Sequence, residues 1–258
     1  MITISRISDK IKWAEEIART RSKGLRTNFY AAAEDFFAEP LFALKFEGGC
    51  YLFHEKERQL DLYFFLEQGA KPVPIPALPK PVVLEQVGVA KTPPDLKEWE
   101  EIGFTSYLQR KRLFLSAKKA EQTERKISFA RETEAEQIFR LMEQAFEPYT
   151  SALPDLKALR QDIREGHVLA AREEDTLLGF LRFGREKKVS VLWQIAVSPL
   201  GRGKGFGRQL VQDWLAAERE ESAKFQLWVR EDNLPALKMY EALDFLPDGR
   251  IAPVMLKK

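Results

Sequence analysis

The chain has 258 residues, which is longer than a typical single domain, so two domains are expected. Hydrophobic residues make up 45% and charged residues 31% of the sequence, as in an ordinary globular protein. The 41 basic residues nearly balance the 39 acidic ones, and the net charge of +2 favours neither a nucleic-acid nor a membrane partner. Cys50 is the single cysteine, which excludes an intrachain disulfide and a cysteine-cluster zinc site.

The beginning of the chain has no long apolar core, so no signal peptide is expected. No apolar run approaches the roughly 18 residues that suggest a transmembrane helix. The expected location is therefore the cytoplasm.

In the first half, turn residues and periodicity predict a series of strands and helices. Five prolines between Pro72 and Pro81 exclude a helix there and predict an extended surface loop. The expected strands are 2–4, 41–46, 50–54, 60–66, 82–89 and 107–115, and the expected helices are 8–23, 29–38 and 94–102.

Residues 116–125 (SAKKAEQTER) are polar and without periodicity, which predicts a linker. A second series of elements follows, in which Thr133 and Glu136 have the spacing of a capping box. The expected strands are 127–130, 167–172, 177–183, 189–197, 225–229 and 254–256, and the helices are 134–147, 153–164, one that begins near 206, and 234–243.

Residues 189–212 (VSVLWQIAVSPLGRGKGFGRQLVQ) combine a strand, a glycine loop and an amphipathic helix. Because glycine has no Cβ, backbone N–H groups can approach a phosphate closely, and the dipole of the helix favours the anion. The stretch therefore predicts a phosphate-binding loop, with a flexible turn between strand and helix as the alternative. Its glycines are Gly201, Gly203, Gly205 and Gly207.

The spacing of these glycines excludes two common nucleotide-binding loops. In G-x-x-x-x-G-K-[ST] a hydroxyl residue follows the lysine, but Lys204 is followed by Gly205. G-x-G-x-x-G needs a final glycine where Phe206 or Arg208 stands. A single RGK segment without stacking aromatic residues also lacks the repeats of an RGG-type RNA-binding segment.

Two motifs resemble those of the GCN5-related N-acetyltransferase (GNAT) family. Residues 202–207 (RGKGFG) are similar to its [Q/R]-x-x-G-x-[G/A] loop, which holds the pyrophosphate of coenzyme A. Residues 233–245 (NLPALKMYEALDF) resemble the family pattern N-x-x-A-x-x-x-Y-x-x-x-G-F, except that Asp244 replaces the usual glycine. The resemblance covers residues 126–258. It implies an α/β (α+β) fold with a mixed, mostly antiparallel twisted sheet flanked by helices.

The resemblance also implies a reaction, the transfer of an acetyl group from acetyl-CoA to a primary amine, without a metal. Tyr240 lies two helical turns beyond Asn233, and by family analogy its phenol is the general acid that protonates the leaving thiolate. Packing is the alternative role for Tyr240, as for Trp99 in the first half. The implied coenzyme-binding residues are Ile195, Ala196 and Val197 on the splayed central strand, Arg202, Gly203, Lys204, Gly205, Phe206, Gly207 and Arg208 in the loop, and Asn233.

The general base is not determined, because the central strand 189–197 contains no carboxylate. A water chain, Glu147, His167 or Glu186 could supply it. The segment after the first helix contacts acceptors in this family, so Phe146, Tyr149 and the strand residue Trp193 are candidate acceptor-binding residues. The acceptor is expected to be a small-molecule or peptide amine. The oligomeric state is left open.

Residues 92–104 and 233–245 match at a constant offset, which suggests that the chain contains two copies of one domain. A short chance match is the alternative. The first copy has the proline segment where the second has its glycine loop, so we expect tandem GNAT-like domains with a degenerate first copy at 1–115, a linker at 116–125 and the acetyltransferase at 126–258. A non-catalytic acyl-CoA-binding or regulatory module is the rival function. The identical pairs are Pro94 and Pro235, Leu96 and Leu237, Lys97 and Lys238, Glu100 and Glu241, and Phe104 and Phe245.

Overall fold

The structure is a computed structural model that describes residues 5–6, 24–29, 41–120, 124–151 and 153–258. It divides into two compact units, a first unit of residues 1–109 with 250–258 and a second unit of residues 110–249. The chain passes from one unit to the other within strand β8 (Thr105–Ser116) and again within strand β14 (Leu246–Lys257). The units thus differ in extent from the predicted domains, which stay a prediction. The strand expected at 2–4 and the helix expected at 8–23 lie outside the described residues, as does the helix expected at 29–38 except for Phe29.

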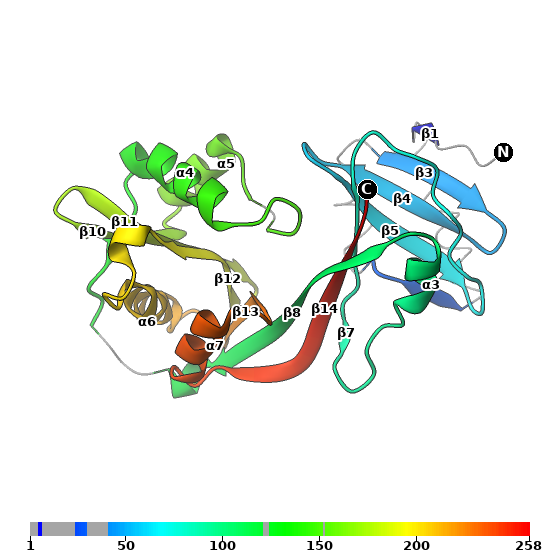
Figure 1. Cartoon of the computed structure of the whole chain (residues 1–258). Helices are drawn as coiled ribbons and strands as arrows, with labels where there is room; N and C mark the ends of the chain where they lie inside the picture. Colours follow the sequence, from blue (N-terminus) through cyan, green and yellow to red (C-terminus); the bar gives the residue numbers. More distant parts are fainter. Residues whose placement is uncertain (1–4, 7–23, 30–40, 121–123, 152) are drawn as a thin grey trace. The chain divides into compact units, whose positions relative to one another are not determined.

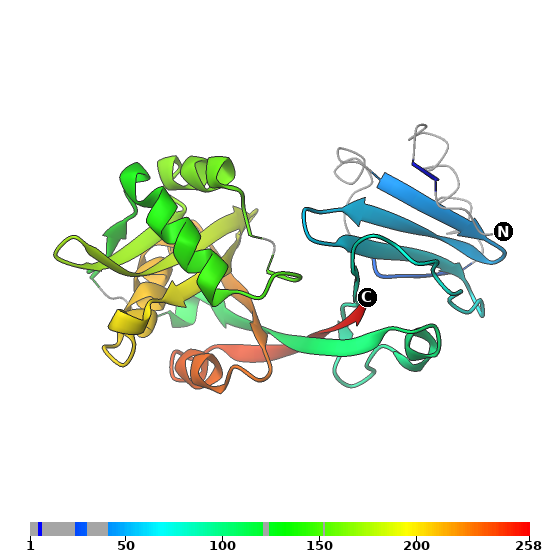
Figure 2. The same cartoon turned by 45° about the horizontal axis from the view of Figure 1, so that its top comes forward.

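An antiparallel meander forms the centre of the first unit (Figure 2). Strand β3 (Leu41–Phe46) turns at Gly48 into β4 (Gly49–Glu55), which pairs with β5 (Leu60–Glu67). The short strands β1 (Ser5–Arg6) and β2 (Leu25–Thr27) pair with β3 and β5.

Strand β6 (Val82–Glu85) runs parallel to β5, and the proline segment that precedes it is neither helix nor strand, as predicted. The end of β14 pairs with β6, so the last residues of the chain complete the first unit's sheet. Helix α3 (Lys97–Glu101) buries Trp99 against this sheet, and β7 (Gly88–Val89) also pairs with β14.

The second unit contains a sheet in the order β8-β13-β12-β11-β10-β9, antiparallel except for the parallel pair β12–β13. The strands are β9 (Ser128–Phe129), β10 (Val168–Glu173), β11 (Thr176–Glu186), β12 (Val189–Val197) and β13 (Lys224–Arg230). The helices are α4 (Ala135–Ala145), α5 (Leu156–Arg164), α6 (Phe206–Glu218) and α7 (Leu234–Glu241), and the 3-10 helices are η1 (Ala117–Lys119), η2 (Glu132–Glu134) and η3 (Pro199–Gly201).

Helices cover both faces of this sheet (Figure 1). On one face, α4 and α5 pack against alternate strand residues that include Val168 and Ala170. On the other face, α6 and α7 pack against their neighbours Leu169 and Ala171 in a larger core. The alternation follows from the period of two of a β-strand, which sends successive side chains to opposite faces. The fold class predicted from the sequence is therefore confirmed.

The segment predicted as a linker contains the short helix η1, whose Ala117 is buried in the second unit's core together with Ala120, and its role as a linker stays a prediction. Two local predictions were wrong. The capping box is formed by Glu134, whose carboxylate accepts a hydrogen bond from the Arg131 N–H at 2.6 Å, two residues earlier than predicted. The last strand is much longer than 254–256, because its two ends serve different units.

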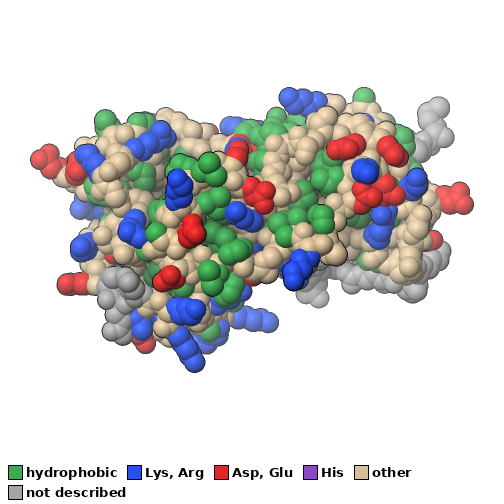
Figure 3. Space-filling view, turned by 60° about the horizontal axis from the view of Figure 1, so that its bottom comes forward, with side chains coloured by type: hydrophobic (Ala, Val, Ile, Leu, Met, Phe, Trp, Pro, Cys, Tyr) green, Lys and Arg blue, Asp and Glu red, His purple; other side chains and the backbone are tan. Residues whose placement is uncertain are grey.

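No helix in the described part of the chain is long and apolar enough to cross a membrane. Figure 3 shows basic, acidic and hydrophobic side chains interspersed on the face that it presents, in keeping with the nearly balanced charge.

Candidate functional site

The glycine loop leads directly into helix α6. Gly203 and Gly205 have φ angles of +76° and +84°, in the left-handed region that side chains other than glycine rarely adopt. A Cβ added to either glycine would meet no atom within 4 Å, so backbone conformation, and not crowding, requires glycine here. Gly205 is the N-cap of the 13-residue helix α6.

Backbone N–H groups gather without acceptors at this helix end. Among the described residues, none accepts a hydrogen bond from the N–H of Gly203, Gly205, Phe206, Gly207 or Arg208. The first N–H groups of an α-helix have no acceptor within the helix, and at the start of α6 no described side chain serves as an acceptor for them. The loop therefore offers converging donors and the positive end of a helix dipole to an anion.

Three predicted parts of the site meet at Gly207. A Cβ added there would lie 3.4 Å from the sulfur of Met239 on α7 and 3.7 Å from Cγ2 of Val197 on β12. The glycine loop, the end of the central strand and the helix that carries Tyr240 are therefore neighbours.

The central strand β12 separates from β13 at its midpoint. The parallel ladder between them ends at the pair Leu192–Leu227, although β12 continues to Val197 and β13 to Arg230. On the other side of β12, the ladder with β11 skips Trp193, which makes Trp193 a β-bulge. The bulge coincides with the separation. Ile195 and Val197 lie beyond it and are half-buried, whereas Ala196 is buried.

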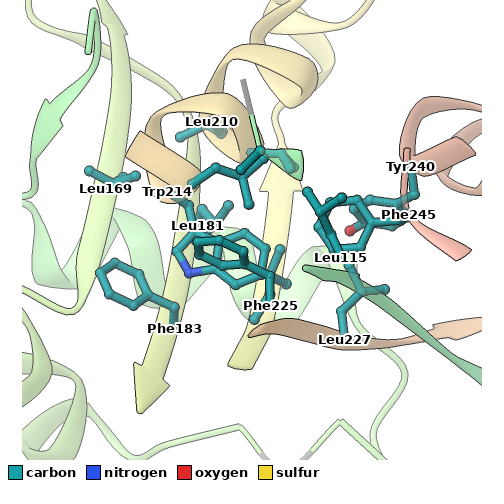
Figure 4. Close-up of a cluster of buried hydrophobic side chains, with 14 of the residues drawn as sticks. Leu115, Leu169, Leu181, Phe183, Leu210, Trp214, Phe225, Leu227, Tyr240 and Phe245 are labelled. Carbon is teal, nitrogen blue, oxygen red and sulfur yellow. The ribbon is translucent and has the colours of Figure 1, made fainter. Parts of the chain in front are cut away.

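Tyr240 is 3% exposed and lies at one end of the core shared by α6, α7 and the sheet (Figure 4). Its ring packs edge-on against Phe245, with 5.6 Å between the ring centroids. Burial raises the pKa of the Tyr240 phenol well above its usual range. Among the described residues, none forms a hydrogen bond with the Tyr240 hydroxyl.

The other predicted coenzyme-binding residues have local structural contacts. The Asn233 side chain caps α7 by accepting from the Ala236 N–H at 3.3 Å. Lys204 forms an ion pair with Glu173 at 2.8 Å, and Arg208 donates to the carbonyl oxygen of Ala242 at 2.7 Å. Arg202 is exposed.

A pocket of about 200 Å³ lies beside Arg208, between α6, α7 and the end of β8, and the sequence did not predict it. One sequence feature could have indicated this pocket. The spacing of Arg208, Gln212 and Leu215 places the three side chains on one face of α6. The remaining lining residues are Leu115, Lys119, Ala242, Leu243 and Asp244.

The candidate bases lie apart. The Glu147 carboxylate accepts hydrogen bonds from the N–H groups of Tyr149 and Thr150 at 2.9 and 2.8 Å, so it binds backbone groups of the turn that follows it. His167 lies 3.5 Å from Glu165 and stacks edge-on against Phe183, whereas Glu186 is exposed at the end of β11.

His167 also belongs to a group of possible metal ligands that the sequence did not predict. Its ring nitrogen and carboxylate oxygens of Asp162 and Glu165 lie within 4.8 Å of one another. However, Asp162 is already paired with Arg182 at 2.6 Å.

Trp193, predicted to bind the acceptor, is 39% exposed and has the Arg182 guanidinium 4.3 Å from its ring centroid. Phe146 and Tyr149 lie on the segment that follows α4 and are half-buried. Sequence reasoning missed Arg182 and Gln194, the two polar residues that link this segment to the sheet. A charged residue inside the apolar run of β11 was the signal that could have identified Arg182.

Comparisons with known proteins give the family of one segment and the fold of the chain. Residues 135–245 match the Acetyltransferase (GNAT) family. No curated protein matches the chain in sequence. A GCN5-related N-acetyltransferase from Sphaerobacter thermophilus has a similar structure, with a TM-score of 0.64, 15% identity, and coverage of 99% of this chain and 95% of that one.

Two further structures show a similar likeness over 99% of this chain. A GNAT-family acetyltransferase from Colwellia psychrerythraea has a TM-score of 0.57 and 13% identity, and the match covers 99% of this chain and 100% of that one. A tandem GNAT protein from the clavulanic acid biosynthesis pathway has a TM-score of 0.57 and 11% identity, with coverage of 99% and 98%. At such identities the likeness shows the fold.

Proposed function

Because residues 135–245 are a domain of the acetyltransferase (GNAT) family, we propose that the second unit binds acetyl-CoA and transfers its acetyl group to a primary amine. The observation that carries the proposal is the glycine loop. Its two left-handed glycines and its N–H groups without acceptors lie at the start of α6, beside the strand separation.

In this proposal the glycine loop and the central strand have different chemical tasks. The N–H groups of Gly203, Gly205 and their neighbours in the loop donate to the coenzyme pyrophosphate. The backbone of β12 beyond Leu192 no longer pairs with β13, which supports the proposal that it binds the pantetheine amides and polarises the thioester carbonyl. Acetyl-CoA supplies the acetyl thioester. The acceptor amine attacks it in the neutral form, and the C–S bond breaks after the C–N bond has formed. The nitrogen loses one proton to water, and the thiolate leaves and takes up a proton from water.

The sequence predicts Tyr240 as the general acid for that thiolate, and we propose that its phenol acts through a hydrogen bond to the sulfur. An ordinary thiol has a pKa of about 8.5, and burial raises the phenol pKa above its usual value of about 10. Proton transfer from Tyr240 is therefore uphill as a complete step. A hydrogen bond that strengthens as charge develops on the sulfur fits the environment of Tyr240 better.

One observation favours the rival, a non-catalytic acyl-CoA-binding module. Tyr240 packs against Phe245 with a centroid separation of 5.6 Å, and Trp99 packs against Phe104 at the same separation in the first unit. Trp99 has no proton to give to a thiolate, so this arrangement of rings also serves packing. The two proposals differ in whether thiol is released when an amine is present.

The first unit is proposed to be a degenerate copy that binds no coenzyme. Both units have a parallel strand pair at the corresponding place, β5–β6 and β12–β13. Residues 68–81 join β5 to β6 without a helix, so this connection offers no helix N-terminus to a phosphate. The acceptor, a small-molecule or peptide amine, and the cytoplasmic location remain proposals that rest on the sequence.

The proposal is tested by titration calorimetry with acetyl-CoA. The parent should bind, and Gly205→Asp should abolish binding, because it strains the loop and places a carboxylate beside the phosphates. Gly69→Asp is the matched control, since Gly69 has a φ of +82° and open space but lies in the first unit. Equal binding by Gly205→Asp would refute the loop assignment. Thiol release with a panel of amines then separates the enzyme from the module.

A further inference from the structure

A buried glutamine occupies the middle of the central strand. Gln194 is 3% exposed and directly follows the bulge at Trp193. Its Nε2 donates to the carbonyl oxygen of Ser151 at 2.9 Å, and its Oε1 accepts from Nη1 of Arg182 at 2.8 Å. Since arginine only donates and a carbonyl only accepts, these two partners fix the orientation of the amide.

Arg182 is itself fixed from the other side. Its Nε donates to the Asp162 carboxylate at 2.6 Å, and both side chains are largely buried, with exposed fractions of 13% and 15%. A continuous chain of hydrogen bonds therefore runs from Asp162 on α5 through Arg182 on β11 and Gln194 on β12 to Ser151. Low exposure strengthens such a chain and makes the loss of one member costly.

The turn that contains Ser151 is held together by Glu147. The Glu147 carboxylate accepts from the N–H groups of Tyr149 and Thr150, from the Thr150 hydroxyl, and from the Ser151 hydroxyl at 3.2 Å. Arg110 on β8 donates to the carbonyl oxygen of Thr150 at 3.2 Å. The turn is thus a preformed unit, and Gln194 is its hydrogen-bonded link to the central strand.

We propose that Gln194 is a positioning residue that holds the 147–151 turn beside the strand separation and thereby sets where the acceptor amine lies relative to the thioester. This inference rests on the proposed function of the second unit. Gln194 takes no proton, because a glutamine amide is not a base at neutral pH and both of its ends are already hydrogen-bonded.

The first measurement needs no acceptor. Amide hydrogen exchange is followed by NMR in the full chain for the parent, Gln194→Ala and Gln194→Met, the latter of which keeps the side-chain volume. Both variants should raise exchange at Tyr149 and Thr150 by about tenfold or more and leave exchange at the glycine loop unchanged. Gln226→Ala on the neighbouring strand is the control and should change neither region. Unchanged exchange in the 147–151 turn of a folded Gln194→Met variant would overturn the inference.

The second measurement separates positioning from proton transfer. Gln194→Glu can still accept from Arg182, but its ionised carboxylate has no hydrogen to donate to Ser151. We expect a rise of about tenfold in acceptor KM, an acetyl-CoA Kd within about twofold of the parent value, and an unchanged pH profile. A new pKa in the profile together with increased turnover would instead assign position 194 to the base. If the parent fails to bind acetyl-CoA, the proposed function fails, whereas the exchange result still tests the link between Gln194 and the turn.

Discussion

The Trp193 indole lies directly over Gly184 on the neighbouring strand. A Cβ added to Gly184 would be 2.0 Å from the Trp193 Cη2 atom, far closer than any non-bonded contact allows. The indole at the β12 bulge occupies the space that a side chain at position 184 would fill, so this position of Trp193 requires glycine at 184 in β11. Arg182, two residues before Gly184 on the same strand, packs against the same ring.

Gly184→Ala should displace the indole and cost about 1 kcal/mol of stability, as expected for moderate overpacking. In a Trp193→Ala background the same change should be neutral within about 0.5 kcal/mol, since the clash is gone. Urea denaturation of the four proteins measures this cycle. Gly179→Ala is the control, because its Cβ would meet the backbone oxygen of Ala196 at 2.8 Å, which Trp193→Ala does not relieve. Equal costs of Gly184→Ala in both backgrounds would contradict the contact.

Tyr240→Phe should lower kcat by about 100-fold and leave the acetyl-CoA Kd within about twofold, because only the developing thiolate uses the hydroxyl. Burial raises the Tyr240 pKa above about 10, so the phenol stays protonated at every pH below that. The ratio of parent to variant activity should therefore be constant from about pH 6 to pH 9.5. Rates measured across this range check it, with the exposed Tyr107→Phe as control. A ratio that falls between pH 7 and 9 would refute this role.

Leu115→Ala should destabilise the second unit although Leu115 lies before the linker predicted from the sequence. Leu115 is 1% exposed and belongs to the core around α6 and α7. Removal of a buried leucine typically costs about 2–5 kcal/mol. Urea denaturation should show a lower free energy of unfolding. Acetyl-CoA titration should show weaker binding at urea concentrations near the unfolding transition. The control is Leu200→Ala, since Leu200 is 70% exposed and its loss should cost little stability. For the same reason, deletion of residues 1–120 should prevent folding of the second unit.

Asp61→Asn should stabilise the first unit at neutral pH. Burial raises the pKa of Asp61, despite a hydrogen bond from Gln59 at 2.7 Å. A raised folded-state pKa means that stability is lost as pH rises from about 4 through that value. The asparagine variant should therefore be more stable than the parent at pH 7, and the difference in stability should disappear below about pH 4. Thermal unfolding from pH 3.5 to 8 tests this. The exposed turn variant Asp175→Asn should show no such trend.

The sequence by itself determined the features that depend on neighbouring residues. Strand 189–197 has the bounds expected from its apolar run, and the glycines at 203 and 205 adopt the backbone conformation that glycine permits. Asp244 has a φ of +62°, and Gly103 a φ of +93°, at the helix ends that the two matching segments predict to be equivalent. Local preferences of this kind need no knowledge of the rest of the chain.

Only the tertiary structure decided which distant segments meet. Strand β8 pairs with β13 more than 100 residues later, and the end of β14 completes the first unit, so the first unit is not a continuous stretch of sequence. The link from Asp162 to Ser151 likewise depends on the pairing of β11 with β12, which brings Arg182 next to Gln194. The physical reason is that strand pairing and buried hydrogen bonds are selected by the packing of the whole core, whereas periodicity along the chain reports only which face of each element is buried.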